Sequence, residues 1–196
     1  MSSPRVLESL AADAVTMGDL AARAVLGIAG TPGAGKSTLV ELLLARIDAW
    51  RGAGWAAHVP MDGFHLADAQ LRRLGLLDRK GAPETFDPAG YAHLLERVRT
   101  ETDADVYAPG FDRGLEQPLA AAVVVPPSAK LVITEGNYLL LDRPVWARAR
   151  RAIDAVWFVS SDDEVRTDRL IARHVAFGKS PHAARSWVAD IDGPNA

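Results

Sequence analysis

The sequence predicts a layered α/β fold in which a mainly parallel sheet lies between helices. Short apolar runs alternate along the chain with amphipathic helical segments, as crossover units between parallel strands require. The first apolar run ends in a glycine-rich loop that is followed directly by a helical pattern. The chain has 196 residues and 48% hydrophobic content, so we expect residues 1–196 to form one domain with a substantial core.

Apolar spacing and turn residues set the order of the expected elements. In the first half these are a helix over 5–22, a strand over 25–29, a helix from 38 to the glycines at 52–54, a strand over 55–59, and a helical piece at 67–77 within the irregular stretch 62–88. In the second half they are a helix over 91–99, a short strand over 105–108, strands over 131–134 and 155–160, and helices over 145–151, 163–176 and 183–189. The stretch 192–196 is typical of a turn into a further element.

Composition and charge exclude several classes of protein. The chain has no cysteine, which excludes a disulfide framework, a thiolate zinc site and a thiol nucleophile. A formal net charge of −3 argues against a broad nucleic-acid surface, which is normally basic. There is neither a signal peptide nor an apolar run near the length that a membrane span requires. We therefore expect a cytoplasmic protein with no nucleic-acid or membrane partner; a homodimer is left open.

The glycine-rich loop after the first strand has the pattern of a phosphate-binding loop. Gly30–Ser37 fits G-x-x-x-x-G-K-[ST] at every fixed position, with an apolar strand before it and a helix after it. Such glycines let backbone N–H groups turn toward a phosphate, and the helix N-terminus favours negative charge. The residues expected to bind a nucleoside triphosphate are Gly30, Thr31, Pro32, Gly33, Ala34, Gly35, Lys36, Ser37 and Thr38.

Residues beyond the loop favour a kinase over other nucleotide-binding proteins. The chain lacks the Asn-Lys-x-Asp segment of GTPases and the Leu-Ser-Gly-Gly-Gln signature of transporter ATPases. Asp62 follows the second strand, where it can orient an acceptor hydroxyl and take its proton. The alternative is that Asp62 and Gly63 form an ordinary turn.

Several segments in the same order resemble one branch of known kinases. They are Gly30–Ser37, Met61–His65, Lys80–Asp87, Pro109–Arg113 and Glu135–Leu141. Together they resemble the uridine kinase, pantothenate kinase and phosphoribulokinase branch of P-loop kinases, and within it bacterial nucleoside- or sugar-kinase-like proteins labelled fructose transport system kinases. The resemblance implies a three-layer P-loop nucleoside triphosphate hydrolase fold with a helical lid, ATP, Mg²⁺, a hydroxyl acceptor, and Asp62 as the catalytic aspartate. Ala82 and Phe86 depart from the pantothenate kinase pattern, and no tyrosine-rich nucleoside contacts are evident, so the acceptor stays open.

Charged residues around these segments complete the expected site. Ser37 and Glu135 are expected to hold Mg²⁺, an ion that takes few carboxylates and keeps several waters. Arg169 and Arg173 share one helix face in a lid over 162–180, where they can neutralise the transferring phosphoryl group. Arg166 on the same face is expected to be structural. The alternative is a solvated basic face paired with Asp162, Asp163 and Glu164.

The acceptor pocket is expected to contain His65, Tyr107, Phe111 and Arg113. An aromatic wall with one arginine suits a polar acceptor that has an apolar face or an anionic group. The alternatives are that Tyr107 belongs to the core and that Asp112 and Arg113 form a surface pair.

The combined reading is an ATP-dependent phosphotransferase acting on a hydroxyl of a small metabolite, such as a sugar, a nucleoside or a pantothenate-like compound. The rival from another class is a nucleotide-binding regulator allied to sugar transport, with little catalysis. A kinase of nucleic-acid ends would need a basic surface that the composition does not supply.

Overall fold

A four-stranded parallel sheet forms the centre of the computed structural model, which describes residues 4–193. Its strands, in the spatial order β2-β5-β1-β6, are β2 (Ala56–Pro60), β5 (Leu131–Gly136), β1 (Ala24–Ala29) and β6 (Ala155–Phe158). Every residue of β1 and β5 is buried, as expected for central strands covered on both faces. The predicted parallel sheet is therefore confirmed.

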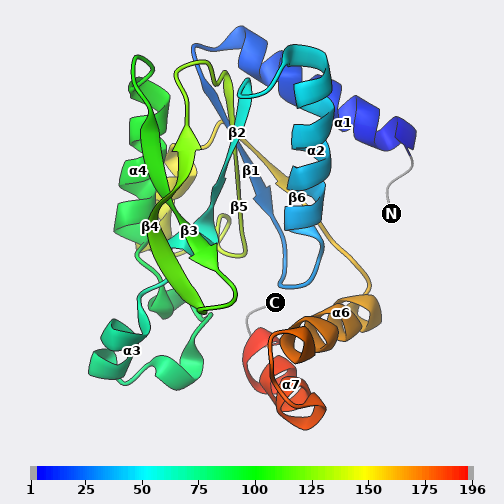
Figure 1. Cartoon of the computed structure of the whole chain (residues 1–196), viewed down its shortest axis with the longest axis vertical. Coiled ribbons are helices and arrows are strands. Elements are labelled where there is room, and N and C mark those ends of the chain that lie inside the picture. The colour runs from blue at the N-terminus through cyan, green and yellow to red at the C-terminus, as the bar shows by residue number, and fades with distance from the viewer. Residues whose placement is uncertain (1–3, 194–196) are drawn as a thin grey trace.

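Helices cover both faces of the sheet and give the three layers that the sequence predicts (Figure 1). α1 (Pro4–Leu20) and α2 (Lys36–Arg51) pack on one face, where Leu43 and Ile47 join Leu26 and Ile28 in one buried cluster. α4 (Pro88–Thr100) and α5 (Pro144–Arg151) cover the other face, with a second cluster built around aromatic and aliphatic side chains. The sheet thus separates two hydrophobic cores.

The smaller elements lie along one side and at one end of this sandwich. Those between β2 and α4 are the 3₁₀ helices Met61–Phe64, Leu77–Arg79 and Pro83–Thr85 and the short helix α3 (Asp68–Leu74). α6 (Asp163–Ala176), α7 (Pro181–Trp187) and a π-helical turn at Val188–Asp192 lie beyond the carboxyl ends of the strands (Figure 1). Residues 188–192 are therefore helical, and 194–196 of the expected terminal turn lie outside the described residues. Within 4–193, no helix has the length and apolar content to cross a bilayer.

A β-hairpin is the element that the sequence analysis missed. The short strand expected at 105–108 extends as β3 (Val106–Asp112) and pairs antiparallel with β4 (Gln117–Val125), for which no strand was predicted. The middle of β4 is an alanine run with no alternation of apolar and polar residues, and most of the strand is exposed. Since neither periodicity nor burial marks it, β4 depends on its pairing with β3.

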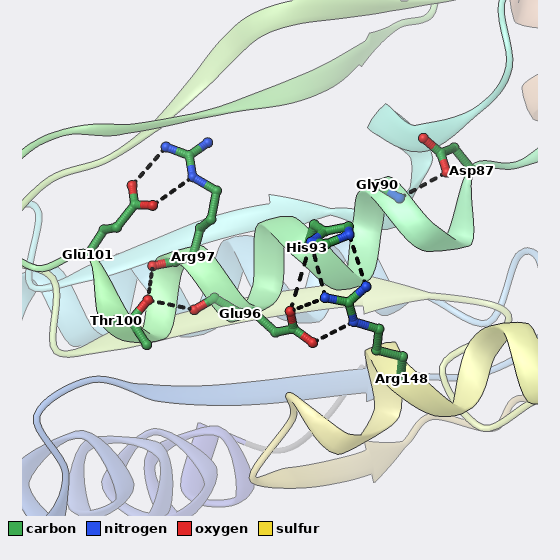
Figure 2. Close-up of polar contacts among 8 residues, drawn as sticks. All are labelled: Asp87, Gly90, His93, Glu96, Arg97, Thr100, Glu101 and Arg148. Carbon is green, nitrogen blue, oxygen red and sulfur yellow. Dashed lines mark hydrogen bonds and ion pairs between the residues drawn. The ribbon is translucent and has the colours of Figure 1, made fainter.

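Polar contacts at the surface tie α5 to α4 (Figure 2). Arg148 of α5 binds Glu96 of α4 through two bonds, Nε to Oε1 at 2.7 Å and Nη2 to Oε2 at 2.5 Å, and also contacts His93. At the start of α4, the Asp87 carboxylate caps the helix by accepting from the Gly90 N–H at 2.8 Å. These contacts orient helices whose apolar faces are already buried.

Arg23 joins three parts of the fold immediately before β1. Its side chain is buried and donates hydrogen bonds to five backbone carbonyl oxygens. These oxygens belong to the end of α4 and to the connection between β4 and β5, at Val98, Glu101, Pro126, Pro127 and Ala129. Such an arrangement supplies donors to carbonyl oxygens at a helix end and in a connection, of which the Pro126 oxygen also accepts from the Ala129 N–H.

Replacing Arg23 with alanine should therefore destabilise the fold strongly. We expect Arg23→Ala to lose about 2–4 kcal/mol of unfolding free energy, because several carbonyl groups lose their donor at once. Urea unfolding followed by circular dichroism measures this loss. The matched control is Arg72→Ala on the exposed surface of α3, which should cost at most about 1 kcal/mol. Equal losses in the two variants would contradict this role of Arg23.

Candidate active site

The loops that follow all four parallel strands meet at one edge of the sheet, as the carboxyl ends of parallel strands must. A cavity of about 1180 Å³ opens at this edge. Residues from each of the four loops and from α6 line it, including Lys36, Asp62, Asn137, Ser160 and Arg173. The structure thus brings together residues that are more than a hundred positions apart in the sequence.

Backbone geometry explains the glycines of the phosphate-binding loop. Gly33 and Gly35 have φ angles of 79° and 99°, in the left-handed region that favours glycine. A Cβ at Gly30 would lie 2.3 Å from the carbonyl oxygen of Val159, and one at Gly33 would lie 2.8 Å from Leu170 of α6. The loop is therefore packed against both the β6 loop and α6, with Gly35 as the N-cap of α2.

Lys36 is buried within this loop and makes three hydrogen bonds. Its Nζ donates to the carbonyl oxygens of Gly30 at 2.9 Å and Thr31 at 3.0 Å, and to Asn137 Oδ1 at 2.6 Å. Burial lowers the pKa of Lys36, an effect opposed by the nearby carboxylates of Glu135 and Asp62. Asn137, which the sequence analysis did not single out, thus positions the lysine.

Close approaches at two glycines, one to backbone and one to a side chain, hold the segment of Asp62 in place. A Cβ at Gly63 would lie 2.2 Å from the Pro109 carbonyl oxygen of β3, and one at Gly136 would lie 2.5 Å from Met61 Sδ. The segment that carries Asp62 therefore packs tightly between β3 and β5. Any larger residue at Gly63 would push Asp62 away from the cavity.

The Asp62 carboxylate lies near the cations Arg113 and Lys36 and beside His65. Its Oδ2 accepts from Arg113 Nη2 at 2.5 Å. Burial by itself would raise the pKa of Asp62, but His65, Arg113 and Lys36 together hold it below the usual value. Asp62 is therefore ionised at neutral pH and able to accept a proton.

Glu135 and Ser37 lie side by side next to the phosphate-binding loop. Ser37 Oγ donates to Glu135 Oε1 at 3.3 Å. Burial, and then the charge of Asp62, raise the pKa of Glu135 to about 7, although Lys36 opposes the shift. His58 Nε2 lies 3.9 Å from Glu135 Oε1, and burial lowers the pKa of His58 to about 4, so this histidine is neutral at pH 7.

These two oxygen donors fit Mg²⁺ better than a metal that needs a full protein cage. Among the described residues, no three His, Cys, Asp or Glu side chains gather as a metal site. Mg²⁺ prefers oxygen ligands, takes one or two from the protein, and keeps waters or phosphate oxygens as the rest. A buried carboxyl with a raised pKa also gains from a nearby cation that stabilises its ionised form.

The arginines of α6 divide as the sequence analysis expected. Arg169 and Arg173 line the cavity, and Arg169 Nη1 lies 3.8 Å from where a Gly35 Cβ would be. Arg166 instead is buried against Gly33 and contacts Asp163 through Nε at 3.3 Å. The solvated-face alternative therefore fails for Arg166. The catalytic parts assigned to Arg169 and Arg173 stay predictions.

Three of the four residues expected in the acceptor pocket come together. The rings of His65 and Phe111 are 4.8 Å apart, and the Arg113 guanidinium lies 4.8 Å from the centre of the Phe111 ring. Tyr107 is not among the cavity-lining residues; it is 57% exposed on β3 and lies roughly 13 Å along the strand from Phe111. Tyr107 therefore lies neither in the pocket nor in the core, the two positions that the sequence analysis considered.

Lys80 is a pocket residue that the sequence analysis did not single out. Its Nζ donates to Asp68 Oδ1 at 2.6 Å and to the Glu116 carbonyl oxygen, and it lies 5.6 Å from the centre of the Phe111 ring. It comes from the irregular stretch between β2 and α4, where no periodicity points to a role. The only signal was its place in the segment Lys80–Asp87.

Comparison with known proteins identifies relatives of this fold and site. No family model matches the chain. A protein of Schizosaccharomyces pombe, provisionally named uridine kinase C227.14, is 34% identical over 160 residues, which are 80% of this chain and 68% of that protein. The ATP-dependent kinase-like protein notR′ of Aspergillus versicolor is 38% identical over 131 residues, which are 63% of this chain and 76% of that protein. A crystal structure from Silicibacter sp. TM1040, provisionally named a fructose transport system kinase, has a TM-score of 0.83 at 35% identity, covering 97% of this chain and 91% of that one.

The chain belongs to the uridine kinase-like branch of P-loop kinases. It is an ATP-dependent kinase, and Gly30–Ser37 has the sequence pattern of a P-loop. The resemblance of the sequence segments to this branch of P-loop kinases is thereby confirmed, as is the three-layer fold that it implied.

The buried carboxyl of Glu135 should lower the unfolding free energy of the kinase when no ligand is bound. The pKa of this carboxyl is about 7 in the folded chain and 4.5 in the unfolded chain. The folded state therefore loses stability as the pH rises between those values. We therefore expect Glu135→Gln to stabilise the ligand-free kinase by about 1–3 kcal/mol at pH 8, and to have little effect at pH 5. Urea unfolding at the two pH values checks this.

The control for this prediction is Glu101→Gln, which removes an exposed carboxylate paired with Arg97. Because that pairing lowers the pKa of Glu101, its replacement should not stabilise the kinase at pH 8. If Glu135→Gln changed the unfolding free energy equally at both pH values, burial would not raise the pKa of the Glu135 carboxyl.

Proposed function

We propose that this kinase transfers the γ-phosphoryl group of ATP to a hydroxyl of a small metabolite, such as a sugar, a nucleoside or a pantothenate-like compound. The observation that carries the proposal is the position of the Asp62 carboxylate, which lies in the same cavity as Lys36 and Ser37. A phosphate-binding site alone would serve hydrolysis or switching as well. A positioned base beside it favours transfer to a hydroxyl.

On the donor side, the residues of the loop bind and orient the triphosphate. The backbone N–H groups of the loop and the Lys36 ammonium hold the phosphates, with Asn137 keeping the lysine in place. Ser37 and Glu135 would hold Mg²⁺, which supplies positive charge to the phosphate oxygens when it is bound. Arg169 and Arg173 extend from α6 to neutralise charge that spreads over the transferring group.

On the acceptor side, Asp62 orients the hydroxyl and takes its proton. A bond forms between the acceptor oxygen and the γ-phosphorus while the bond from phosphorus to the ADP oxygen breaks. The proton of the hydroxyl passes to Asp62 and from there to solvent, so charge and atoms balance. Closure of α6 over the cavity would limit access of water, which would otherwise compete as the acceptor.

Removing the charge of Asp62 should separate chemistry from binding. We expect Asp62→Asn to lower kcat by about 10²- to 10⁴-fold, because an amide cannot accept the proton, while ATP affinity changes only a few-fold. Coupled ADP release measures kcat, and calorimetry measures ATP binding. The control is Asp78→Asn on the exposed surface, which should behave like the wild type. A fully active Asp62→Asn kinase would refute the assignment of the base.

Removing Lys36 should damage both binding and turnover. We expect Lys36→Ala to weaken ATP affinity by at least about tenfold, because the phosphates lose a buried cation. The matched control is Lys130→Ala, an exposed lysine just before β5. Unchanged ATP affinity in Lys36→Ala would place the triphosphate elsewhere.

The rival proposal is a nucleotide-binding regulator allied to sugar transport. It would bind ATP through the same loop but release no ADP in response to any acceptor. An acceptor screen by ADP release, run on the wild type and on Asp62→Asn, therefore distinguishes the two.

A further inference from the structure

Arg113 occupies one carboxylate oxygen of the base that the proposed reaction needs. It extends from the end of the β3–β4 hairpin, and its Nη2 donates to Asp62 Oδ2 at 2.5 Å. Such a short charge-assisted bond competes with any hydroxyl that approaches the same oxygen. For Asp62 to receive an acceptor hydroxyl on this oxygen, the guanidinium must find another anionic partner.

A second cation faces the same aromatic ring. Lys80 Nζ lies 5.6 Å and Arg113 lies 4.8 Å from the centre of the Phe111 ring. The ring packs against His65, which in turn contacts Phe86 with ring centres 4.0 Å apart. The aromatic floor expected of an acceptor pocket is therefore bordered by two positive charges.

Both cations have hydrogen-bond donors left for a ligand. Arg113 has five N–H donors, and within residues 4–193 Asp62 is its only hydrogen-bond partner. Lys80 uses two of its three donors, on Asp68 and on the Glu116 carbonyl oxygen. Arg173 lines the same cavity, and the positive charge of Arg113 contributes to lowering its pKa after burial, so the two guanidinium groups are close.

The positive charges of Arg113 and Lys80 favour an acceptor that carries an anionic group. A neutral acceptor offers Arg113 no replacement for Asp62, so Oδ2 of the base stays engaged. A carboxylate or phosphate group offers a guanidinium a bidentate partner of equal or greater strength. The binding energy of such a group is then used to free the base next to the hydroxyl.

We propose that the acceptor is a small hydroxylated anion, whose phosphate or carboxylate group binds Arg113 and Lys80 and so releases Asp62 for the hydroxyl. This inference rests on the proposed function and adds the class of substrate and the residue that selects it. Arg113 is thus both a binding residue and the reason that neutral analogues react poorly.

Matched pairs of acceptors test the inference. The panel is glycerol, glycerate and glycerol 3-phosphate, ribose and ribose 5-phosphate, and pantothenate with its neutral alcohol. We expect wild-type kcat/KM to be at least about 100-fold higher for an anionic member than for its neutral counterpart, from two charge-assisted contacts. Carboxylates and phosphates in the panel distinguish the two anionic groups.

Arg113→Gln should then remove the discrimination rather than the activity. We expect kcat/KM to fall about tenfold or more for the anionic acceptor, but to stay constant or rise for the neutral one, since Asp62 is free in this variant. Arg113→Lys should recover part of the preference. The matched control is Arg97→Gln, a surface arginine paired with Glu101, which should leave both acceptors unchanged. Equal losses for both acceptors in Arg113→Gln, or a wild-type preference for neutral acceptors, would overturn the inference.

A binding measurement separates this inference from the proposed function. With a non-hydrolysable ATP analogue filling the phosphate-binding loop, each panel compound is titrated by calorimetry into the wild type and into Arg113→Gln. Anions that bind the wild type at least tenfold more tightly than the variant support the inference even when no ADP is released, in which case only the proposed transfer fails. Anion binding that is absent, or the same in both proteins, refutes the inference.

Discussion

The parallel pairing of β5 with both β1 and β2 is the constraint on which the site depends. In this register Glu135 lies opposite Ile28 of β1 and Pro60 of β2, so the loops that follow all three strands start at the same level. Lys36, Asp62 and Glu135 therefore meet although they belong to different units of the chain. A shift of register would separate the groups that hold the donor from the group that serves the acceptor.

One buried environment gives two carboxyls opposite properties. Within residues 4–193, Glu135 forms no ion pair with a lysine or arginine, and burial raises its pKa, whereas at Asp62 the effect of burial is outweighed by His65, Arg113 and Lys36, which lower the pKa. These opposite properties suit the two tasks that we propose for the groups, a metal ligand that gains from a cation and an ionised base. The strain at Glu135 is the kind of stability cost that functional sites carry.

The donor and acceptor halves of the site are built in different ways. The donor half is a strand–loop–helix unit whose glycines are required by left-handed φ angles and close packing. The acceptor half is assembled from a hairpin end and an irregular stretch, which bring Arg113 and Lys80 to one ring. Relatives with this fold carry different substrate names, as expected when function resides in such additions to a shared scaffold.

Patterns within short windows were enough to predict the alternation of strands and helices, the phosphate-binding loop, and Asp62 and Glu135 at strand ends. Each of these features is local, since it depends on the period of apolar residues or on a fixed spacing of glycines and a lysine. Other features emerged only in the tertiary structure. They are the strand β4, the position of Tyr107, the link between Asn137 and Lys36, and the ion pair between Arg113 and Asp62. These depend on which distant segments pack together, and the energy of such contacts leaves no periodic trace in the sequence. The sequence by itself thus determined the kinase family and the glycine-rich loop, while long-range packing decided which charges surround Asp62 in the cavity.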